Sequence, residues 1–440
     1  MEKSSRRNFL KNGTVAATGM AVWNGCKSAT PVGSTARWKG ANERIRVACI
    51  GIRGQGGSHI RGFEALENVE VVTFCDIDER VLADRVKEYE GPFGRKLKTE
   101  WDMRRVFDDP SIDVVSFATP HHWHALGTVW ACQAGKHVYV EKPASHNVWE
   151  GRKMIEASRK YDRMVQYGVQ GRSSPALKEA VEHLRKGTIG EVYMARGICY
   201  RWRPTIGHKE EEDVPAGVHY DMWLGPAPKR PFTQNRFHYN WHYYWDYGNG
   251  DLGNQGVHQM DICRWGLGVE LPTEITTSGG RYLWPEDDKE IPNVTTSCFR
   301  YPDANKELVF EVRPWITNEE AGIKVGTIFY GSEGILVTEG SDRYAIFLGE
   351  KLEPGPKQQA TGNPFQNLID AVRTRDRSLL NAEIENGHYS AALCHLGLIA
   401  HRVKRQLVFD PEKERFVGDS EADKLLTRKY RKPYIIPDKV

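Results

Sequence analysis

Between residues 44 and 165, short apolar runs alternate with segments in which apolar residues recur at helical spacing. The runs are expected to be strands at Ile45–Ile50, Val69–Cys75, Val114–Ala118, Val138–Val140 and Met164–Val169. The segments between them are expected to be helices at His59–Leu66, Arg80–Glu88, Trp123–Cys132 and Val148–Lys160. Strands that alternate with helices predict a parallel, doubly wound sheet, so residues 44–165 are expected to form an α/β domain.

The pattern changes near residue 166. After a helical pattern at Pro175–Lys186, strand-like segments follow with few helices between them, which predicts a second α+β domain over residues 166–362, built on a large, mostly antiparallel open sheet. The expected strands are Val192–Trp202, Glu274–Leu283, Val294–Tyr301, Glu307–Trp315, Thr327–Tyr330 and Ile335–Thr338. Residues 363–405 show a strong helical pattern and are expected to pack back on the core. Residues 406–440 are charged and contain proline, as expected of a surface tail.

Residues 1–43 have a different character. Ser5-Arg6-Arg7-Asn8-Phe9-Leu10-Lys11 precedes a weakly apolar run rich in Ala, Gly and Thr, and this resembles a twin-arginine export signal followed by a linker. The alternative is a basic disordered tail. The resemblance implies an exported, periplasmic protein that meets the twin-arginine machinery already folded around a tightly bound cofactor. Two alternatives stay open at Gly25-Cys26: attachment of a lipid to Cys26, or a plain cleaved signal.

Charge and composition narrow the class of protein. The chain has 61 Lys and Arg against 58 Asp and Glu, a net charge of +3, and removing residues 1–25 leaves 57 − 57 = 0. A neutral domain lacks the excess of cations that nucleic-acid phosphates require, so we expect no nucleic-acid partner. The run from Gly13 to Trp23 is shorter than the roughly 20 apolar residues of a membrane-spanning helix. Cys49 and Cys75 lie inside apolar runs and are expected to be buried thiols.

A glycine-rich loop follows the first predicted strand. It reads Gly51-Ile52-Arg53-Gly54-Gln55-Gly56-Gly57, in which Arg53 replaces the middle glycine of the usual G-x-G-x-x-G pattern. Glycines at a strand-to-helix turn let a pyrophosphate approach the backbone N–H groups and the positive helix end. Asp76, at the end of the second strand, is placed to accept hydrogen bonds from ribose hydroxyls and to repel a 2′-phosphate. The loop and Asp76 predict NAD in preference to NADP.

Two further strand ends carry polar residues. The strand predicted at Val114–Ala118 ends in Ala118-Thr119-Pro120, which precede His121, His122 and His124. The next predicted strand ends in Glu141-Lys142-Pro143. Ligands of open α/β sheets bind at this carboxyl edge. No acidic or cysteine partner accompanies the histidines at metal-ligand spacing, so we expect no metal site and place His124 beside the nicotinamide.

These residues resemble the Gfo/Idh/MocA oxidoreductases over about residues 44–405. The matching elements are the strand-end and Glu-Lys-Pro motifs above, Gln170-Gly171-Arg172, Trp223-Leu224-Gly225-Pro226 and the run from Gly253 to Asp261. The resemblance implies an NAD(P)-binding Rossmann domain, an open-sheet domain that holds substrate and supports homo-oligomers, and chemistry at a hydroxyl carbon of a sugar or cyclitol. It assigns to the cofactor Thr119, Pro120, His124, Glu141, Lys142 and Gln170, beside the loop residues Gly51, Arg53, Gly54, Gln55 and Gly56 and the carboxylate of Asp76.

Hydride transfer from a secondary alcohol requires a base for the hydroxyl proton and a donor that stabilises the developing alkoxide. The resemblance gives Lys142 and His258 these catalytic roles. Asn254 and Asp261 lie four residues before and three after His258, so all three can share one helix face. Asn254 replaces the Asp of the inositol-dehydrogenase type, which removes a carboxylate from the proton relay.

Substrate contacts are expected from Lys142, Asn254 and His258, and from Arg172 in the matched motif. Residues 237–247 alternate aromatics with His and Asn, as carbohydrate sites do, so Trp241 and Tyr244 are further candidates, with packing or subunit contact as the alternative.

The sequence thus predicts an exported NAD-dependent oxidoreductase that moves a hydride to or from a secondary hydroxyl carbon of a sugar, sugar acid or cyclitol. One alternative is an NAD-dependent glycosidase that works by transient oxidation, elimination and re-reduction. In exported glycosidases of this superfamily the Glu-Lys-Pro element lacks lysine, whereas this chain keeps Lys142. A further alternative, favoured by Asn254, is a cofactor-stabilised carbohydrate-binding protein without turnover.

Overall fold

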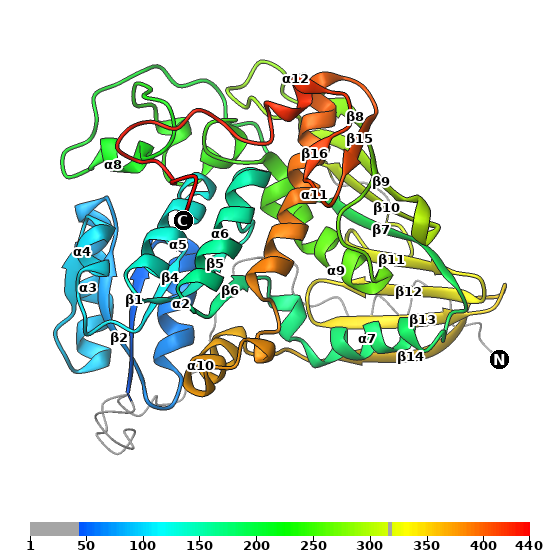
Figure 1. Cartoon of the computed structure of the whole chain (residues 1–440), viewed down its shortest axis with the longest axis horizontal. Helices are drawn as coiled ribbons and strands as arrows, with labels where there is room; N and C mark the ends of the chain where they lie inside the picture. Colours follow the sequence, from blue (N-terminus) through cyan, green and yellow to red (C-terminus); the bar gives the residue numbers. More distant parts are fainter. Residues whose placement is uncertain (1–43, 316–318) are drawn as a thin grey trace.

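The computed structural model describes residues 44–315 and 319–440. The predicted export signal and Cys26 therefore lie outside the described residues. Figure 1 shows two sheets side by side, with the long helix α11 (Ile384–Val403) running between them. Among the helices of the described ranges, none has the length and apolar character needed to cross a bilayer.

The N-terminal sheet has six parallel strands in the order β3-β2-β1-β4-β5-β6. The strands are β1 (Ile45–Ile50), β2 (Val69–Cys75), β3 (Lys98–Glu100), β4 (Val114–Phe117), β5 (His137–Glu141) and β6 (Val165–Gly168). The helices between them are α2 (Gly54–Glu64), α3 (Glu79–Phe93), α4 (Met103–Phe107), α5 (His121–Gln133) and α6 (Val148–Lys160). The predicted doubly wound fold is confirmed, and β3 is added to the expected strands. Cys49 and Cys75 are buried in β1 and β2.

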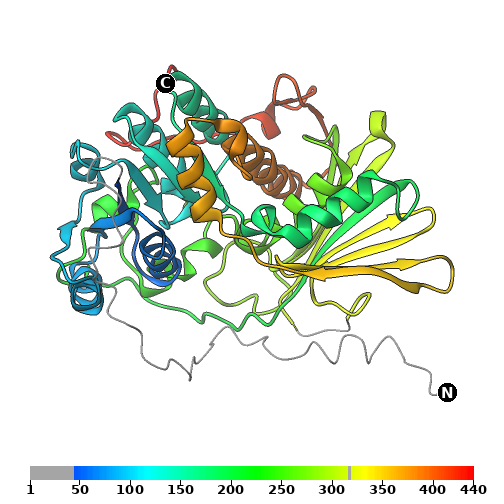
Figure 2. The same cartoon turned by 90° about the horizontal axis from the view of Figure 1, so that it is seen from below.

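The second sheet has ten strands in the order β14-β13-β12-β11-β7-β10-β9-β8-β15-β16. They are β7 (Val192–Tyr200), β8 (Glu274–Gly280), β9 (Val294–Tyr301), β10 (Lys306–Arg313), β11 (Val325–Gly331), β12 (Gly334–Glu339), β13 (Arg343–Leu348), β14 (Glu353–Gln359), β15 (Leu407–Asp410) and β16 (Arg415–Phe416). Only β7 and β10 pair in parallel, so the large, mostly antiparallel sheet is confirmed. Figure 2 shows α7 (Pro175–Arg185) and α11 on the same side of these strands. Helices α7 and α11 thus cover one face of this sheet.

The C-terminal part of the chain joins the two domains. Helix α10 (Pro364–Thr374) contacts α2, and α11 contacts α6, α9 (Val257–Leu267) and β8. Residues 406–440 do more than cross the surface: β15 extends the large sheet, and the segment beyond the short α12 (Ser420–Asp423) runs back toward α5 in Figure 1. There Tyr434 is buried against Trp123. The tail is therefore part of the packed structure.

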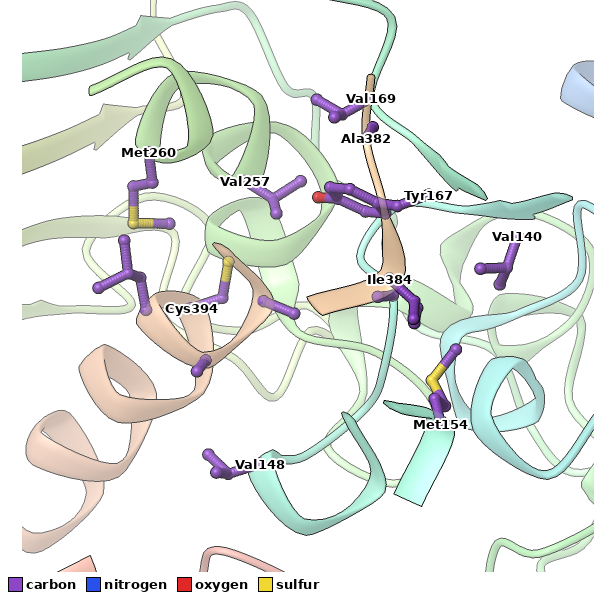
Figure 3. Close-up of a cluster of buried hydrophobic side chains, with 14 of the residues drawn as sticks. Val140, Val148, Met154, Tyr167, Val169, Val257, Met260, Ala382, Ile384 and Cys394 are labelled. Atoms are coloured by element: carbon purple, nitrogen blue, oxygen red, sulfur yellow. The ribbon is translucent and has the colours of Figure 1, made fainter. Parts of the chain in front are cut away.

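A shared hydrophobic core holds the domains together. Helix α11 is apolar around most of its circumference, which is typical of a helix buried on all sides. Figure 3 shows side chains from both domains meeting there, with Tyr167 of β6 close to Val257 of α9 and to Ile384 of α11. This continuous packing fixes the carboxyl edge of the parallel sheet against the helix that carries His258.

Candidate active site

A cavity of about 240 Å³ lies at the carboxyl ends of the parallel strands. Its walls come from the glycine-rich loop, the strand ends and an aromatic segment of the second domain. Among the lining residues are Gly51, Arg53, Gly54, Gln55, Asp76, Trp101, Thr119, Pro120, His121, Glu141, Lys142, Trp223, His238, Tyr239, Trp241 and Asn254. Most of the residues predicted from the loop and strand-end motifs thus meet in one place.

The glycine-rich loop has the geometry that a pyrophosphate needs. Gly51 has a φ of +77°, which disfavours any side chain, and a Cβ on Gly56 would lie 1.9 Å from the Gly51 carbonyl oxygen. Arg53 stands at the N-cap of α2 without a side-chain cap, and a Cβ on Gly54 would meet nothing within 4 Å. The first-turn N–H groups of α2 therefore face open space beside the loop, as an anion-binding helix start does.

Asp76 is held by the backbone around it. One carboxylate oxygen accepts from the Ile52 N–H at 3.0 Å, and the other accepts from the Asp78 N–H at 3.2 Å. Burial raises the pKa of Asp76 to about 6, although these hydrogen bonds and Arg53 oppose the rise. Each oxygen keeps a lone pair for a further donor, so the carboxylate fits the two hydroxyls of a ribose.

Glu141 forms a buried network behind the cavity. Its carboxylate accepts from Gln55 Nε2 at 3.0 Å and lies 3.1 Å from His59 Nε2, while His59 Nδ1 lies 2.7 Å from Ser116 Oγ. Burial alone would raise the pKa of Glu141, but the hydrogen bond with His59 and the nearby Lys142 ammonium lower it to about 2. Glu141 is therefore a fixed negative charge next to Lys142.

Lys142 extends from the end of β5 into the cavity. Its ammonium donates to the main-chain oxygen of Asn254 at 2.6 Å and lies 3.2 Å from the Asn254 side-chain oxygen. Burial lowers the pKa of Lys142, with Arg203 acting in the same direction and Glu141 in the opposite one. A desolvated ammonium with a lowered pKa gives up its proton more readily than an exposed lysine does, which suits a group that exchanges a proton with substrate.

The helix that carries His258 begins irregularly. Leu252–Gly256 forms a π-helical turn, and α9 starts at Val257. The wider turn changes the expected helix face, because Asn254 points to Lys142 and is not bonded to His258. The Cys394 thiol donates to the Leu252 carbonyl at 3.3 Å, which gives one of the turn's main-chain oxygens a partner.

His258 is half-buried and, among the described residues, is not part of the cavity lining. Burial and the Lys142 ammonium lower the pKa of His258 to about 4, while Glu141 and Asp261 oppose the change. At neutral pH the imidazole is therefore uncharged and able to accept a proton.

Two family models match the chain. One, described as the oxidoreductase family's NAD-binding Rossmann fold, matches residues 45–169, and the other, its C-terminal alpha/beta domain, matches residues 176–281 and 348–436. The chain belongs to the Gfo/Idh/MocA oxidoreductase family. Its N-terminal domain is accordingly an NAD-binding Rossmann domain, as the glycine loop and Asp76 predicted.

The curated proteins that are similar to this chain include both a glycosyl hydrolase and a dehydrogenase. A glycosyl hydrolase family 109 protein of Solibacter usitatus is 28% identical over 44% of this chain and 45% of its own length. A levoglucosan dehydrogenase of Pseudarthrobacter phenanthrenivorans is 35% identical over 24% of this chain and 27% of its own. The matches thus span less than half of these curated relatives. The crystal structure of the WlbA dehydrogenase of Chromobacterium violaceum, in complex with NADH and UDP-GlcNAcA, superposes with a TM-score of 0.64 at 16% identity, covering 84% of this chain and 97% of the other.

In this Gfo/Idh/MocA chain, His124 lies away from the expected cofactor contact. Its Nδ1 lies 2.7 Å from the Pro143 carbonyl oxygen and its Nε2 lies 2.9 Å from the Thr119 carbonyl oxygen. Both ring nitrogens thus face the backbone of two strand ends. The ring holds β4 and β5 at a fixed separation, so His124 positions the cavity wall.

Arg172 also differs from its expected placement. Its guanidinium Nε lies 2.9 Å from a carboxylate oxygen of Asp261, and both side chains are buried. Ser390 donates to the same carboxylate at 2.6 Å. Arg172 therefore forms a buried ion pair between the second domain's first residues and α9, and the cavity lining in the described residues does not include it. The carboxylate of Asp261 is therefore already bonded to Arg172 and Ser390.

The aromatic stretch divides between wall and core. Trp241 lines the cavity, and its ring meets His121 edge to face at 4.6 Å. Tyr244 is buried in an aromatic cluster that contains Trp223 and against which Trp241 packs, and it is not among the described residues that line the cavity. Gln170 opens a 3-10 turn at residues 170–173 and is outside the described cavity lining.

Sequence reasoning did not put forward several residues of the cavity wall, among them Trp101, His121, His238 and Tyr239. His121 was seen only as part of a histidine cluster. His238 and Tyr239 lie in the aromatic stretch 237–247 but were not singled out there, and Trp101 lies in a segment without a motif. His238 has a φ of +63° and its Nε2 lies 3.1 Å from the Asp78 carboxylate. This contact ties the aromatic segment to the start of α3 and closes the cavity over the ribose end.

Proposed function

We propose that this protein is an NAD-dependent oxidoreductase that transfers a hydride to or from a secondary hydroxyl carbon of a sugar, sugar acid or cyclitol. The observation that carries the proposal is the Lys142 ammonium, which lies in the cavity against the two oxygens of Asn254 and interacts electrostatically with the fixed carboxylate of Glu141. A desolvated lysine at this edge of a dinucleotide-binding sheet is suited to hold a hydroxyl oxygen beside the cofactor.

The residues present fit NAD. The pyrophosphate would lie on Gly51, Gly54, Gly56 and the start of α2, and the ribose hydroxyls on Asp76, whose charge disfavours the 2′-phosphate of NADP. Bound in this way, the nicotinamide supplies the hydride acceptor or donor at the Lys142 end. Replacing Asp76 with Ser should weaken NAD and improve NADP; an equal loss of both would leave Asp76 a structural role only.

Lys142 and His258 have different roles in proton transfer. The Lys142 ammonium donates to the hydroxyl oxygen and stabilises negative charge that develops there during oxidation. The uncharged imidazole of His258 accepts the hydroxyl proton, which its lowered pKa allows at neutral pH. Asn254 orients Lys142 through its two oxygens, and Trp241 supplies a flat apolar face for the sugar ring.

Contacts between the domains favour slow release of the cofactor. The 218–247 segment of the second domain reaches the Rossmann domain through a β-bridge between Asp78 and Val218, the His238–Asp78 contact, and the contact of His219 Nε2 with Glu79 at 2.9 Å. Because the same segment contributes Trp223, His238, Tyr239 and Trp241 to the cavity, the cofactor leaves only when these contacts open. Retained NAD supports a redox-neutral cycle.

Such a cycle keeps the glycosidase alternative open. Transient oxidation, elimination, water addition and re-reduction leave no net change in the cofactor, and the resemblance to a glycosyl hydrolase family 109 protein favours it. The non-catalytic binding alternative predicts neither spectral change nor product. The Lys142 that this chain retains favours the dehydrogenase reaction, and so do the dehydrogenases among its relatives.

Export completes the proposal. The residues Ser5 to Lys11 support passage through the twin-arginine machinery to the periplasm, and Gly25-Cys26 leaves a lipid anchor open. The open face of the ten-stranded sheet supports a homo-oligomer. Cell fractionation of the full chain against an Arg6→Lys, Arg7→Lys variant tests export, because the variant should remain in the cytoplasm.

The experiment that separates the reactions offers purified, NAD-loaded protein a panel of sugars, sugar acids, cyclitols and aryl glycosides. Absorbance of the reduced nicotinamide is followed together with release of the aryl group. Reduced nicotinamide formed with one class of polyol supports the dehydrogenase. Aryl release without net reduction supports the glycosidase. If no member of the panel gives either reduced nicotinamide or aryl release, both enzyme proposals are contradicted.

A further inference from the structure

One side chain of the cofactor cavity has no part in the proton transfers assigned to Lys142 and His258. His121 begins α5, shortly after the end of β4, and it lines the cavity with Lys142 and Trp241. The residue is 1% exposed as a whole, so its ring meets open space only inside this cavity. Its two ring nitrogens have different surroundings, and these decide what the ring can bind.

Asn249 determines where the imidazole carries its proton. The side-chain nitrogen of Asn249 donates to the His146 main-chain oxygen at 3.2 Å and lies 3.4 Å from Nδ1 of His395. The side-chain oxygen of Asn249 lies 3.2 Å from Nδ1 of His121. A main-chain oxygen only accepts, so the amide nitrogen must face His146 and the amide oxygen must face His121. The amide oxygen also only accepts, so Nδ1 of His121 carries a proton and donates it to Asn249.

The His121 ring is uncharged at neutral pH. Burial lowers its pKa well below the ordinary value, and the neighbouring His124, Lys142, His146 and His242 act in the same direction. An uncharged imidazole carries one ring N–H proton, and in His121 that proton is on Nδ1. Nε2 therefore has a free lone pair and can only accept a hydrogen bond.

Nε2 of His121 is open to a ligand. Among the described residues it has no hydrogen-bond partner, yet protein does not close it off as it closes off the partnerless Nε2 of His242. The Lys142 ammonium, in contrast, can only donate. The cavity thus offers hydroxyl groups two complementary partners, since Lys142 binds a hydroxyl oxygen and His121 binds a hydroxyl hydrogen.

Trp241 and Lys142 show where this acceptor lies. The Trp241 ring centroid is 4.6 Å from that of His121, with the two planes at 80°, and Lys142 is close enough for its charge to act on the imidazole. A polyol ring that packs on Trp241 with one hydroxyl at Lys142 therefore lies within reach of His121. The proton of the oxidised hydroxyl goes to His258 in the proposed reaction, so Nε2 of His121 is left for another hydroxyl of the same ring.

We propose that Nε2 of His121 accepts a hydrogen bond from a second substrate hydroxyl, near the one that is oxidised, with Asn249 as the residue that positions the imidazole. A buried acceptor left without a donor is costly, so this contact selects polyols and rejects secondary alcohols and deoxy analogues that lack the second hydroxyl. The inference rests on the proposed function and names the substrate feature that the same cavity recognises.

The test compares the polyol that the substrate panel identifies with its monodeoxy analogues, each of which keeps the oxidised hydroxyl. For wild-type protein, kcat/KM should fall about 10- to 100-fold with one of the analogues. In His121→Phe, which keeps a flat ring without an acceptor, kcat/KM for the polyol itself should fall to the value for that analogue, so the discrimination disappears. His121→Gln retains an acceptor oxygen and should keep part of the discrimination. His208→Phe alters an exposed histidine and should discriminate as the wild type does.

Nitrogen-15 NMR of histidine-labelled, NAD-loaded protein tests the proton position without depending on turnover. The signals that are lost in His121→Gln should show a protonated Nδ1 and an unprotonated Nε2. Asn249→Leu should change this pattern and weaken the discrimination, which keeps the test decisive if His121→Phe does not fold.

A protonated Nε2 in wild-type His121 would overturn the proposal. Equal discrimination in the wild type and His121→Phe would also overturn it, and a raised NAD Kd in that case would assign the acceptor to the nicotinamide. If no polyol reduces NAD in the wild type, the proposed function and this inference fail together. If polyols reduce NAD but no deoxy analogue is rejected, only this inference fails.

Discussion

The Lys142 ammonium lies 2.6 Å from the main-chain oxygen of Asn254 and 3.2 Å from its side-chain oxygen. The π-helical turn Leu252–Gly256 presents both oxygens to the lysine, and α9 begins immediately afterwards with His258 on its first turn. Position 254 therefore acts on the lysine of the site. A carboxylate at this position, as in the inositol-dehydrogenase type, would form an ion pair with Lys142.

The Asn254→Asp variant tests this geometry. A carboxylate next to the ammonium should raise the pKa of Lys142, because an opposite charge stabilises the protonated form. The alkaline limb of the kcat/KM profile should then move to higher pH, and the acidic limb should stay where it is. The measurement is the pH dependence of kcat/KM for both proteins. Movement of the acidic limb alone would instead assign Asn254 to His258.

Asp76 gives a second pH dependence, with opposite signs for binding and stability. The pKa of Asp76 in the folded apo protein is about 6, above the ordinary 3.8. The folded state thus holds this proton more strongly than the unfolded state does, so the Asp76 contribution to stability rises as pH falls from about 6 to about 4. NAD affinity should fall over the same range, because protonation removes the charge that accepts the ribose hydroxyls.

Titration of NAD at several pH values, beside urea unfolding of the apo protein, measures both effects. In Asp76→Asn the NAD affinity should be weak and flat with pH, and the Asp76 contribution to unfolding should disappear. An unchanged pH dependence of NAD affinity in Asp76→Asn would show that another group controls it.

Arg172 should matter for stability more than for substrate. Removing one partner of a buried ion pair leaves the other without compensation, which typically costs about 3–5 kcal/mol. Arg172→Met should lower the free energy of unfolding by about this amount while the KM of the folded fraction stays near the wild-type value. Urea unfolding and steady-state kinetics measure the two. The double variant Arg172→Met, Asp261→Leu should recover part of the stability; a large rise in KM without loss of stability would restore Arg172 to substrate binding.

His238 should control how fast NAD leaves. Its contact with Asp78 holds the aromatic segment over the ribose end of the cavity. Loss of one half-buried hydrogen bond to a carboxylate in His238→Ala should speed NAD dissociation by about tenfold. Stopped-flow displacement of NAD measures the rate. His208→Ala, which removes an exposed histidine bonded to Asp288, is the matched control and should not change the rate. Equal rates in all three proteins would show that the His238–Asp78 contact does not control NAD release.

Local pattern predicted the parts of the structure that depend on neighbours in sequence. The bounds of β1, β2 and β9 agree with the expected runs, because β1 and β2 are largely apolar stretches and β9 alternates buried with more exposed positions. Strand β3 was missed, since its sequence Lys-Thr-Glu is polar and pairs only along the sheet edge. Strand β15 was missed because its pairing with β8 joins segments far apart in the chain.

The candidate site divides in the same way. The loop glycines, Asp76, Glu141 and Lys142 follow strand ends, so sheet topology alone brings them to one edge. Trp101 reaches the cavity only through tertiary contacts, which no short motif records, and His238 lies in the aromatic stretch 237–247 without having been singled out there. The spacing of Asn254 and His258 predicted a shared α-helical face, and the π-helical turn between them altered it. Packing of Gly256 against the Phe310 ring, where a Cβ would lie 2.5 Å from a ring carbon, belongs to that turn.

The most direct test of the central claim measures single-turnover reduction of bound NAD in wild type, Lys142→Met and His258→Ala with the polyol that the substrate panel identifies. Each variant should reduce NAD about 10²–10⁴ times more slowly, the range typical of a positioned acid or base, and should bind NAD with the wild-type Kd. Slower reduction with unchanged NAD binding is the result expected if Lys142 and His258 act on the substrate hydroxyl. Wild-type rates of reduction in Lys142→Met would contradict the account.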